Sequence, residues 1–167
     1  NKKYIYINNN MGAGVLPFAI YKDTIYFLFS REYIKGTVDA GLWSDFGGKE
    51  EKNETIKETA IRECYEESNG FLGTKNNIKG LVNNSLTDIT KNGYKTYLVN
   101  IDYDKDLPNK FRKDFLNTKK NNPEIIYKNG LYEKDMVKWM KYKDLSKNMH
   151  IFRPWYKNII RFILHKM

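Results

Sequence analysis

The sequence has 167 residues, of which 41% are hydrophobic and 15% aromatic, and its formal net charge is +9 at pH 7. This length predicts one domain with its own core over residues 1–167, and the aromatic content excludes a largely disordered chain. A membrane-spanning helix needs about 20 apolar residues, whereas the run at residues 159–164 is short and broken by Arg161, so we expect no membrane contact.

The first predicted elements form an antiparallel hairpin. Residues 13–20 and 25–29 are apolar runs of strand length, and Lys22 and Asp23 are expected to form the turn between them. A loop is predicted over residues 32–41, which contain two glycines.

A turn and a helix are expected next. Residues 43–49 are predicted to be a turn, because two adjacent glycines permit backbone conformations that other residues resist. A helix is predicted to begin just after Thr55, which forms a capping-box pattern with Glu58. The helix is expected to end at Asn69 and Gly70, since both residues accept the left-handed conformation.

The remaining elements alternate between strands and helices. Strands are predicted over residues 80–87 and 94–101, with a hairpin turn at residues 91–93. A basic helix is expected over residues 105–122, and its apolar residues at helical spacing are Phe111, Phe115 and Leu116.

The C-terminal part completes the predicted fold. Residues 137–140 read as a short strand, and Pro154 is placed to open a last helix. The apolar face of that helix is expected to consist of Ile159, Ile160, Ile163 and Leu164. This order of elements predicts a mixed sheet with helices packed on it, which is an α/β or α+β fold.

Three carboxylates share one face of the helix predicted after Thr55. At 100° per residue, Glu63 and Glu67 lie within about 40° of each other, and Glu66 lies at the adjacent edge. Like charges at this spacing destabilise a helix, and Arg62 is the neighbour that can offset them. A solvated acidic face is one reading, and the other is a site for a hard divalent cation such as Mg²⁺ or Mn²⁺.

The segment that carries these carboxylates resembles the Nudix box. The family pattern is Gly-x5-Glu-x7-Arg-Glu-apolar-x-Glu-Glu-x-Gly-apolar, and the matching residues here are Gly48, Glu54, Arg62, Glu63, Glu66 and Glu67. The resemblance extends over residues 13–145, including the strand at residue 13, the approach at residues 43–49, and Glu133 before Trp139. Two departures are Cys64 at the apolar position and Asn69 followed by Gly70, which we interpret as a variant helix end.

The resemblance implies a fold and a reaction. It implies an α/β/α sandwich with a mixed sheet, and an enzyme that cleaves the pyrophosphate bond of a nucleoside diphosphate linked to another group. Glu63, Glu66 and Glu67 are expected to hold Mg²⁺ or Mn²⁺, with help from the carbonyl of Gly47. Adjacent phosphates repel an incoming nucleophile, so cations are needed to neutralise them and to orient the attacking water.

The other roles that the resemblance implies are catalytic and structural. Glu133 is the candidate for general base or additional metal ligand, and Glu67 is its rival for the base. A surface position beside Lys134 is the alternative for Glu133. Glu54 and Arg62 are expected to pair and brace the loop against the helix, with Gly48 at its start.

The sequence specifies the residues that contact substrate less closely than it specifies the metal ligands. The candidates are Arg31 for a phosphate, with Phe46 and Lys49 next to the box. Trp43, Tyr33 and Trp139 are further aromatics that can stack on a base. Packing in the core is the alternative for each aromatic.

The net charge bears on the partner. A charge of +9 favours a polyanion, so a nucleotide or another polyphosphate is the expected substrate. Two alternatives are the 5′ cap of RNA, which would make the chain a decapping enzyme and RNA partner, and diphosphoinositol phosphates. A Nudix fold that binds without catalysis is a third hypothesis, and the intact acidic triple argues against it. The basic residues of the predicted helix that could face the site are Lys110, Arg112, Lys113, Lys119 and Lys120.

The expected compartment follows from cysteine usage and from the start of the sequence. One Cys excludes an internal disulfide framework and suits a reducing compartment, and residues 4–10 do not read as a secretory signal. We therefore expect a cytoplasmic location. The abundance of Lys, Asn and Ile suits an AT-rich organism or a large DNA virus, and a viral protein would act in the host cytoplasm.

Overall fold

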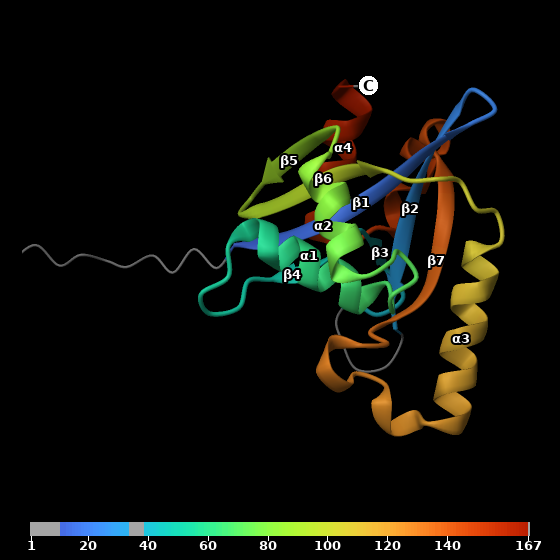
Figure 1. Ribbon diagram of the computed structural model, residues 1–167. Coiled ribbons are helices and arrows are strands. Elements are labelled where there is room, and N and C mark those ends of the chain that lie inside the picture. Colours follow the sequence, from blue (N-terminus) through green and yellow to red (C-terminus); the bar gives the residue numbers. More distant parts are fainter. Residues whose placement is uncertain (1–10, 34–38, 167) are drawn as a thin grey trace, which may run out of the picture.

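A mixed sheet of seven strands organises the chain in the computed structural model, which describes residues 11–33 and 39–166 (Figure 1). The strands are β1 (Gly12–Tyr21), β2 (Thr24–Glu32), β3 (Trp43–Ser44), β4 (Phe46–Lys49), β5 (Thr87–Lys91), β6 (Tyr94–Asn100) and β7 (Lys134–Lys141). The main path runs β3-β2-β1-β6-β5, with β4 on β1 and β7 on β2. β1 and β6 pair in parallel and the other named pairs are antiparallel.

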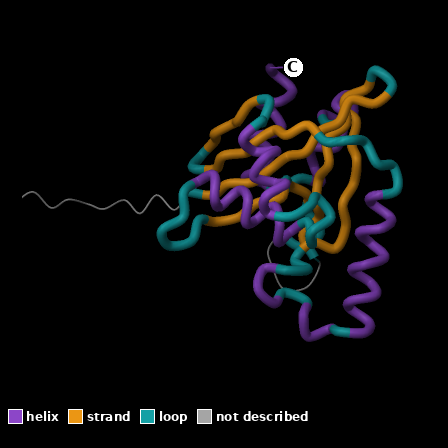
Figure 2. The backbone as a smooth tube through the Cα atoms, viewed as in Figure 1, coloured by secondary structure: helices purple, strands orange, loops and turns teal. Residues whose placement is uncertain are grey.

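Helices cover both faces of the sheet. The α-helices are α1 (Ile56–Glu67), α2 (Lys75–Asn83), α3 (Leu107–Asn121) and α4 (Lys157–Lys166). In Figure 1, α1 and α2 lie in front of the sheet and α4 lies behind it; Figure 2 shows α3 standing beside β7. Short 3₁₀ segments are Pro123–Ile125, Lys128–Gly130, Tyr142–Asp144, Ser146–Ile151 and Pro154–Tyr156. The predicted α/β/α sandwich with a mixed sheet is confirmed.

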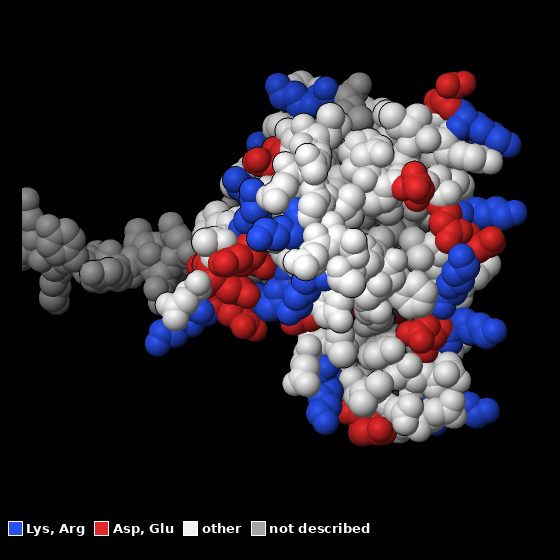
Figure 3. All heavy atoms as spheres, viewed as in Figure 1, with Lys and Arg blue, Asp and Glu red and all other residues white. Residues whose placement is uncertain are grey.

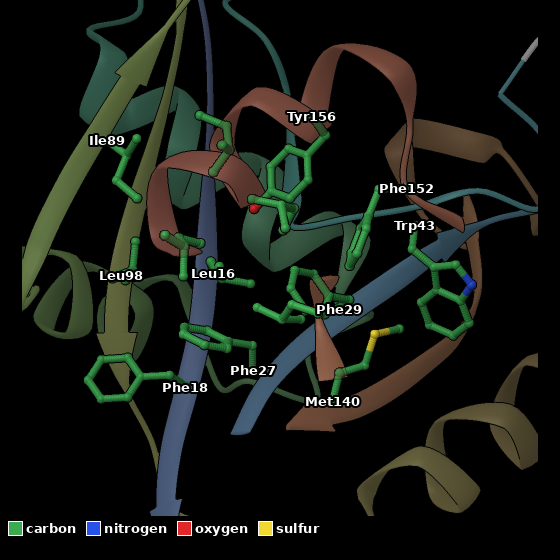
Figure 4. Close-up of a cluster of buried hydrophobic side chains, with 14 of the residues drawn as sticks. Leu16, Phe18, Phe27, Phe29, Trp43, Ile89, Leu98, Met140, Phe152 and Tyr156 are labelled. Carbon is green, nitrogen blue, oxygen red and sulfur yellow. The ribbon is translucent and has the colours of Figure 1, made fainter. Parts of the chain in front are cut away.

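Each face of the sheet has its own apolar core. One core packs α4 and the 3₁₀ segments before it against the sheet, and Figure 4 shows Tyr156 and Phe152 directed toward Phe29 on β2. The other core packs α1, α2 and α3 on the opposite face, through residues such as Cys64 and Phe111. The candidate site lies where α1 meets β4 beside this second core.

Local signals placed the first hairpin and α1 correctly. Lys22 and Asp23 have φ angles of 47° and 57° in the turn between β1 and β2, which is the geometry that short hairpins favour. Thr55 and Glu58 form the predicted capping box at the start of α1. The helix ends as predicted, because Asn69 follows it with a positive φ of 50°.

The strand predicted over residues 80–87 is wrong. Residues 75–83 form α2, which begins at a second capping box between Thr74 and Asn77. Ile78 and Val82 are one helical turn apart and both are buried. A helix therefore places the apolar residues of this segment in the core, although a short apolar run by itself is also compatible with a strand. The strand starts later, at β5, and its turn into β6 at residues 91–93 is confirmed.

The turn predicted over residues 43–49 is also wrong, since this segment contains β3 and β4. The paired glycines serve close packing. A Cβ at Gly47 would collide with the hydroxyl of Tyr94, and a Cβ at Gly48 would lie 2.6 Å from the carboxyl carbon of Glu63. Glycine is needed here because other elements approach the backbone of β4 from both sides.

The C-terminal predictions hold with three adjustments. α3 buries Phe111 and Phe115, but Leu116 is 47% exposed, so it is not part of the buried face. β7 is longer than the predicted strand at residues 137–140. Pro154 opens a 3₁₀ turn that leads into α4. Of the loop predicted over residues 32–41, residues 34–38 lie outside the described part.

No helix in the described part of the chain has the length and apolar character needed to cross a membrane.

Candidate active site

Carboxylates from two distant parts of the chain line one pocket. Glu63 and Glu66 come from α1, and Glu133 comes from the residue before β7. The pocket has a volume of about 450 Å³, and its lining residues are Glu51, Arg62, Glu63, Glu66, Asn129, Gly130 and Glu133. The structure therefore brings together the box carboxylates and Glu133, which are separated by more than sixty positions in the sequence.

Arg62 lies at the centre of this acidic group. Its Nη1 atom is 2.8 Å from Glu63 Oε1 and 3.2 Å from Glu66 Oε2. On its other side, the guanidinium donates to both oxygens of Glu54, at 2.6 and 3.0 Å. It also donates to the carbonyl of Lys49 at 3.0 Å. The Glu54–Arg62 pair expected from the resemblance is therefore present, and it ties the end of β4 to α1.

The same pair dominates the titration of Glu54. The hydrogen bonds from Arg62 lower the pKa of Glu54 to about 2, against the smaller opposing effect of burial. A charge-assisted, two-point contact of this kind is stronger than a neutral hydrogen bond. The loop before α1 is thus held in place by a carboxylate that stays ionised.

Glu67 lies beneath the pocket and is only 3% exposed. Its Oε2 accepts a hydrogen bond from the backbone N–H of Gly47 at 2.7 Å, and its Oε1 lies 3.4 Å from Nζ of Lys134. Burial raises the pKa of Glu67 well above its usual value, although the charge of Lys134 opposes this shift. Both carboxylate oxygens of Glu67 are therefore already engaged.

Lys134 is the residue at this site that sequence reasoning missed. From the sequence it was named only as the neighbour of Glu133 and was given no role. It is fully buried and lies 2.6 Å from Glu32 Oε2. Burial lowers the pKa of Lys134, and the charges of Glu67 and Glu32 outweigh that effect and raise it. Side chains alternate along a strand, so a half-buried Glu133 at the pocket and an inward Lys134 are compatible, but the acidic partners of Lys134 come from other elements.

The pocket carboxylates repel one another. Burial raises the pKa of Glu63, and the charge of Glu66 adds to the shift while Arg62 opposes it. Burial also raises the pKa of Glu133, with further contributions from Glu32 and Glu63. Part of the cost of holding these negative charges together is left uncompensated by the protein.

The donor set fits a hard divalent cation in its chemistry. Carboxylate oxygens are the ligands that Mg²⁺ and Mn²⁺ prefer, and positive charge would relieve the repulsion in the pocket. Across residues 11–33 and 39–166, however, no three His, Cys, Asp or Glu side chains are already arranged around one metal position. Glu63 and Glu66 each contact Arg62 through one oxygen, so the second oxygen of each carboxylate is available to a cation.

Two of the predicted substrate contacts do not hold. Phe46 is fully buried in the core beneath α1, so the prediction that it touches substrate is wrong. Arg31 does not line the carboxylate pocket; its guanidinium donates to both oxygens of Asp135 at 2.9 and 2.6 Å. The prediction that it meets a phosphate thereby loses its basis. Lys49 keeps an exposed side chain at the end of β4.

The other aromatic candidates pack internally. Tyr33 and Trp43 are buried, and the indole of Trp139 donates to the carbonyl of Asp104 at 2.8 Å. Two aromatic side chains that the sequence did not single out, Tyr94 and Trp155, line a pocket next to β4. Nothing local to either position indicates that it lies near the box.

Asp45, the residue before β4, is a fully buried carboxylic acid whose pKa is shifted by its surroundings. Burial raises its pKa from 3.8 to about 6, although hydrogen bonds from Tyr94 and Thr96 oppose the shift. The folded state therefore holds the proton of Asp45 more tightly than the unfolded state does. The contribution of Asp45 to the free energy of unfolding is fully present below about pH 4 and is lost as the pH rises through about 6. The loss amounts to about 3 kcal/mol.

We expect the substitution Asp45→Asn to remove this dependence. As the pH rises from 4 to 7, the unfolding free energy of the wild type should fall relative to that of the variant by up to about 3 kcal/mol. Urea unfolding of both proteins at several pH values measures the difference. A difference that stays constant across this range would contradict the prediction.

Comparisons with known proteins agree with this architecture. A family model described as NUDIX domain matches residues 12–162. The chain is also similar to the uncharacterized protein L534 of Acanthamoeba polyphaga mimivirus, with 40% identity over 70 residues, which are 41% of this chain and 22% of that protein. The chain thus spans about a fifth of the length of that curated relative.

Solved structures with the same fold include two enzymes. The Ap4A hydrolase of C. elegans has 17% identity and a TM-score of 0.50, covering 94% of both chains. The bifunctional NMN adenylyltransferase/ADP ribose pyrophosphatase of Francisella tularensis, complexed with AMP and a Mn ion, has 16% identity and a TM-score of 0.57, covering 95% of this chain and 42% of that one. At such low identities the likeness shows the fold alone.

Proposed function

The chain belongs to the NUDIX domain family, and from that premise we propose that it is a metal-dependent pyrophosphohydrolase acting on a nucleotide-type substrate. The observation that carries the proposal is the single pocket lined by Glu63, Glu66 and Glu133, with Glu67 held beneath it by Gly47. Cleavage of a diphosphate by water requires several carboxylates close together, because they hold the cations that neutralise the phosphates. A solvated surface has no need of such a cluster.

The metal ligands in this proposal are Glu63, Glu66 and Glu67 together with the carbonyl of Gly47. To bind the cation, Glu67 would exchange its contact with Lys134, the longer of its two contacts. The chemistry that Mg²⁺ or Mn²⁺ supplies when bound is neutralisation of charge on the phosphate oxygens. Arg62 already contacts two of these carboxylates and can stabilise them when no cation is present. Its hydrogen bond to Glu54 holds the guanidinium beside these carboxylates.

Glu133 is the better candidate for the general base. Both oxygens of Glu67 are engaged by Gly47 and Lys134, whereas Glu133 faces the pocket. In the proposed step, a carboxylate oxygen of Glu133 takes a proton from water while the water oxygen bonds to phosphorus. The bond from phosphorus to the bridging oxygen breaks, and the leaving phosphate departs with that oxygen.

A second candidate is the 5′ end of RNA or a diphosphoinositol phosphate, and the net charge of +9 favours it. The described surface supports it only in part. On α3, Lys110 pairs with Asp104 and Arg112 pairs with Asp135, while Lys113 and Lys120 are exposed. In the view of Figure 3, basic side chains are spread among acidic ones and do not form one continuous patch.

The proposal is tested by measuring release of phosphate-containing products with Mg²⁺ or Mn²⁺. The substrates are nucleoside triphosphates, nucleotide sugars, dinucleoside polyphosphates, capped RNA and diphosphoinositol phosphates. We expect one of them to be preferred, and Glu66→Gln to reduce its turnover at least about 100-fold, because a neutral amide is a poor ligand for the cation. Glu58→Gln, on the exposed start of α1, is the matched control.

Two results would redirect the proposal. If wild type and Glu66→Gln were equally inactive on every substrate, a binding module without catalysis would replace the enzyme. If capped RNA were preferred and its binding weakened steeply with salt, the RNA candidate would replace the small nucleotide.

A further inference from the structure

A second pocket lies on the other side of β4 from the acidic pocket. It has a volume of about 290 Å³, near the lower end of the range for ligand sites, so it suits a single ring system. Its lining residues are Gly12, Gly47, Gly48, Lys49, Asn92, Gly93, Tyr94, Arg153 and Trp155. We call it the ring slot.

Glycines and the ring of Tyr94 form the floor of the ring slot. Glycines from β1, β4 and the turn before β6 line it, and the approach is too close for side chains at two of them. A Cβ at Gly12 would lie 2.7 Å from the ring of Tyr94, and one at Gly47 would collide with the Tyr94 hydroxyl. The Tyr94 ring therefore lies against these two glycines, and it gives this part of the floor an aromatic surface.

The wall of the ring slot is an aromatic side chain that is already fixed. Trp155 is half-buried, its ring centroid lies 4.6 Å from that of Tyr94, and the guanidinium of Arg153 lies 4.9 Å from it. Arg153 is itself held by Asp39 at 2.9 Å. A ligand therefore meets an ordered indole and does not have to immobilise it.

The charge at the ring slot suits a ring that carries phosphates. Lys49 and Arg153 line the slot with Trp155, and none of the described lining residues is acidic. Because Arg153 is paired with Asp39 and lies 3.8 Å from Glu32, Lys49 supplies most of the positive charge that a ligand would meet. An aromatic wall next to cations binds a flat heterocycle with an attached anion better than a polyol covered with phosphates.

The ring slot adjoins the catalytic carboxylates. Gly47 faces Tyr94 in the slot, whereas the next residue, Gly48, faces Glu63 on the other side. Lys49 lines the slot with its side chain and accepts a hydrogen bond from Arg62 through its carbonyl. One strand, β4, therefore separates the two pockets.

We propose that the ring slot binds the base of a nucleotide, against Trp155, with its phosphates leading past Lys49 to the carboxylate pocket. This inference rests on the proposed function for the direction of the phosphates. It assigns Trp155 as the residue that selects nucleotides over diphosphoinositol phosphates.

Binding without turnover tests the ring slot directly. The probes are AMP, GMP, CMP, UMP and ribose 5-phosphate, titrated calorimetrically with EDTA present so that no hydrolysis occurs. We expect at least one nucleotide to bind about tenfold more tightly than ribose 5-phosphate, because base stacking is worth roughly that factor or more. Trp155→Leu should remove this advantage and Trp155→Phe should keep most of it.

Tyr21→Ala is the matched control. Tyr21 is an exposed aromatic side chain, stacked on Tyr103 at the far end of β1, so its loss should leave nucleotide binding unchanged. A wild-type measurement covers the case in which Trp155→Leu does not fold. In the NMR spectrum of the wild type, the indole N–H resonance of Trp155 is identified by its absence from the spectrum of Trp155→Phe. This resonance should shift when the nucleotide is added and should not shift when ribose 5-phosphate is added.

The outcomes separate the ring slot from the proposed function. Equal binding of nucleotides and ribose 5-phosphate, or unchanged binding by a folded Trp155→Leu, would overturn the slot even if the protein hydrolyses a diphosphate. Nucleotide binding that depends on Trp155, in a protein that hydrolyses nothing, would support the slot and remove the proposed activity.

Discussion

Replacing Glu133 by Gln is expected to lower kcat for the preferred substrate by between about 10²- and 10⁴-fold, the usual contribution of a general base. An amide has nearly the same shape as the carboxylate but does not accept the proton from water. Folding should be preserved, because burial already disfavours the charged form of Glu133 and raises its pKa. Steady-state kinetics with saturating Mg²⁺ or Mn²⁺, together with a thermal unfolding midpoint, measures both effects.

The same variant separates the two roles proposed for Glu133. If Glu133 is a metal ligand and not the base, raising the metal concentration should restore much of the lost turnover. If it is the base, added metal should have no effect. Glu124→Gln, at an exposed position in the preceding 3₁₀ segment, is the control, and turnover by Glu133→Gln equal to that of this control would exclude both roles.

Replacing Lys134 by Met is expected to have the largest effect on stability. Lys134 is fully buried between Glu32 and Glu67, 2.6 and 3.4 Å from their carboxylates. Removing the Lys134 ammonium leaves two buried carboxylates without their closest cation, and breaking a buried ion pair in this way costs about 3–5 kcal/mol. Urea unfolding at pH 7, with the free energy extrapolated to water, measures the loss.

Lys138→Met is the matched control for this prediction. Lys138 lies on the same strand but its side chain is exposed, so its replacement should change the unfolding free energy by less than about 0.5 kcal/mol. If the two variants were equally stable, Lys134 would not carry the stabilising role that its burial indicates.

Local sequence patterns were sufficient for elements whose determinants are neighbours in the chain. The capping box of Thr55 and Glu58 placed the start of α1, and the left-handed residue Asn69 placed its end. The turn at residues 91–93 was found for the same reason. At residues 80–87 the apolar pattern alone predicted a strand where part of a helix lies. The capping residue Thr74, which begins α2, is the local signal that indicates the helix.

The acidic part of the candidate site was also predictable from sequence. Glu63, Glu66 and Glu67 lie on one helix, so the helix period alone brings them together. Their resemblance to a family motif added Glu133 from a distant segment, and the structure places it in the same pocket as Glu63 and Glu66. The roles proposed for these residues await the kinetic tests.

The sequence by itself therefore determined the family, the fold class and the carboxylate cluster, because each depends on residues at fixed spacing. Only the tertiary structure decided what surrounds that cluster. It buried Phe46 in the core, turned Lys134 inward between two glutamates, and brought Trp155 beside β4. These positions depend on how strands and helices distant in sequence pack together, and burial and charge pairing are set by that packing and not by any local pattern.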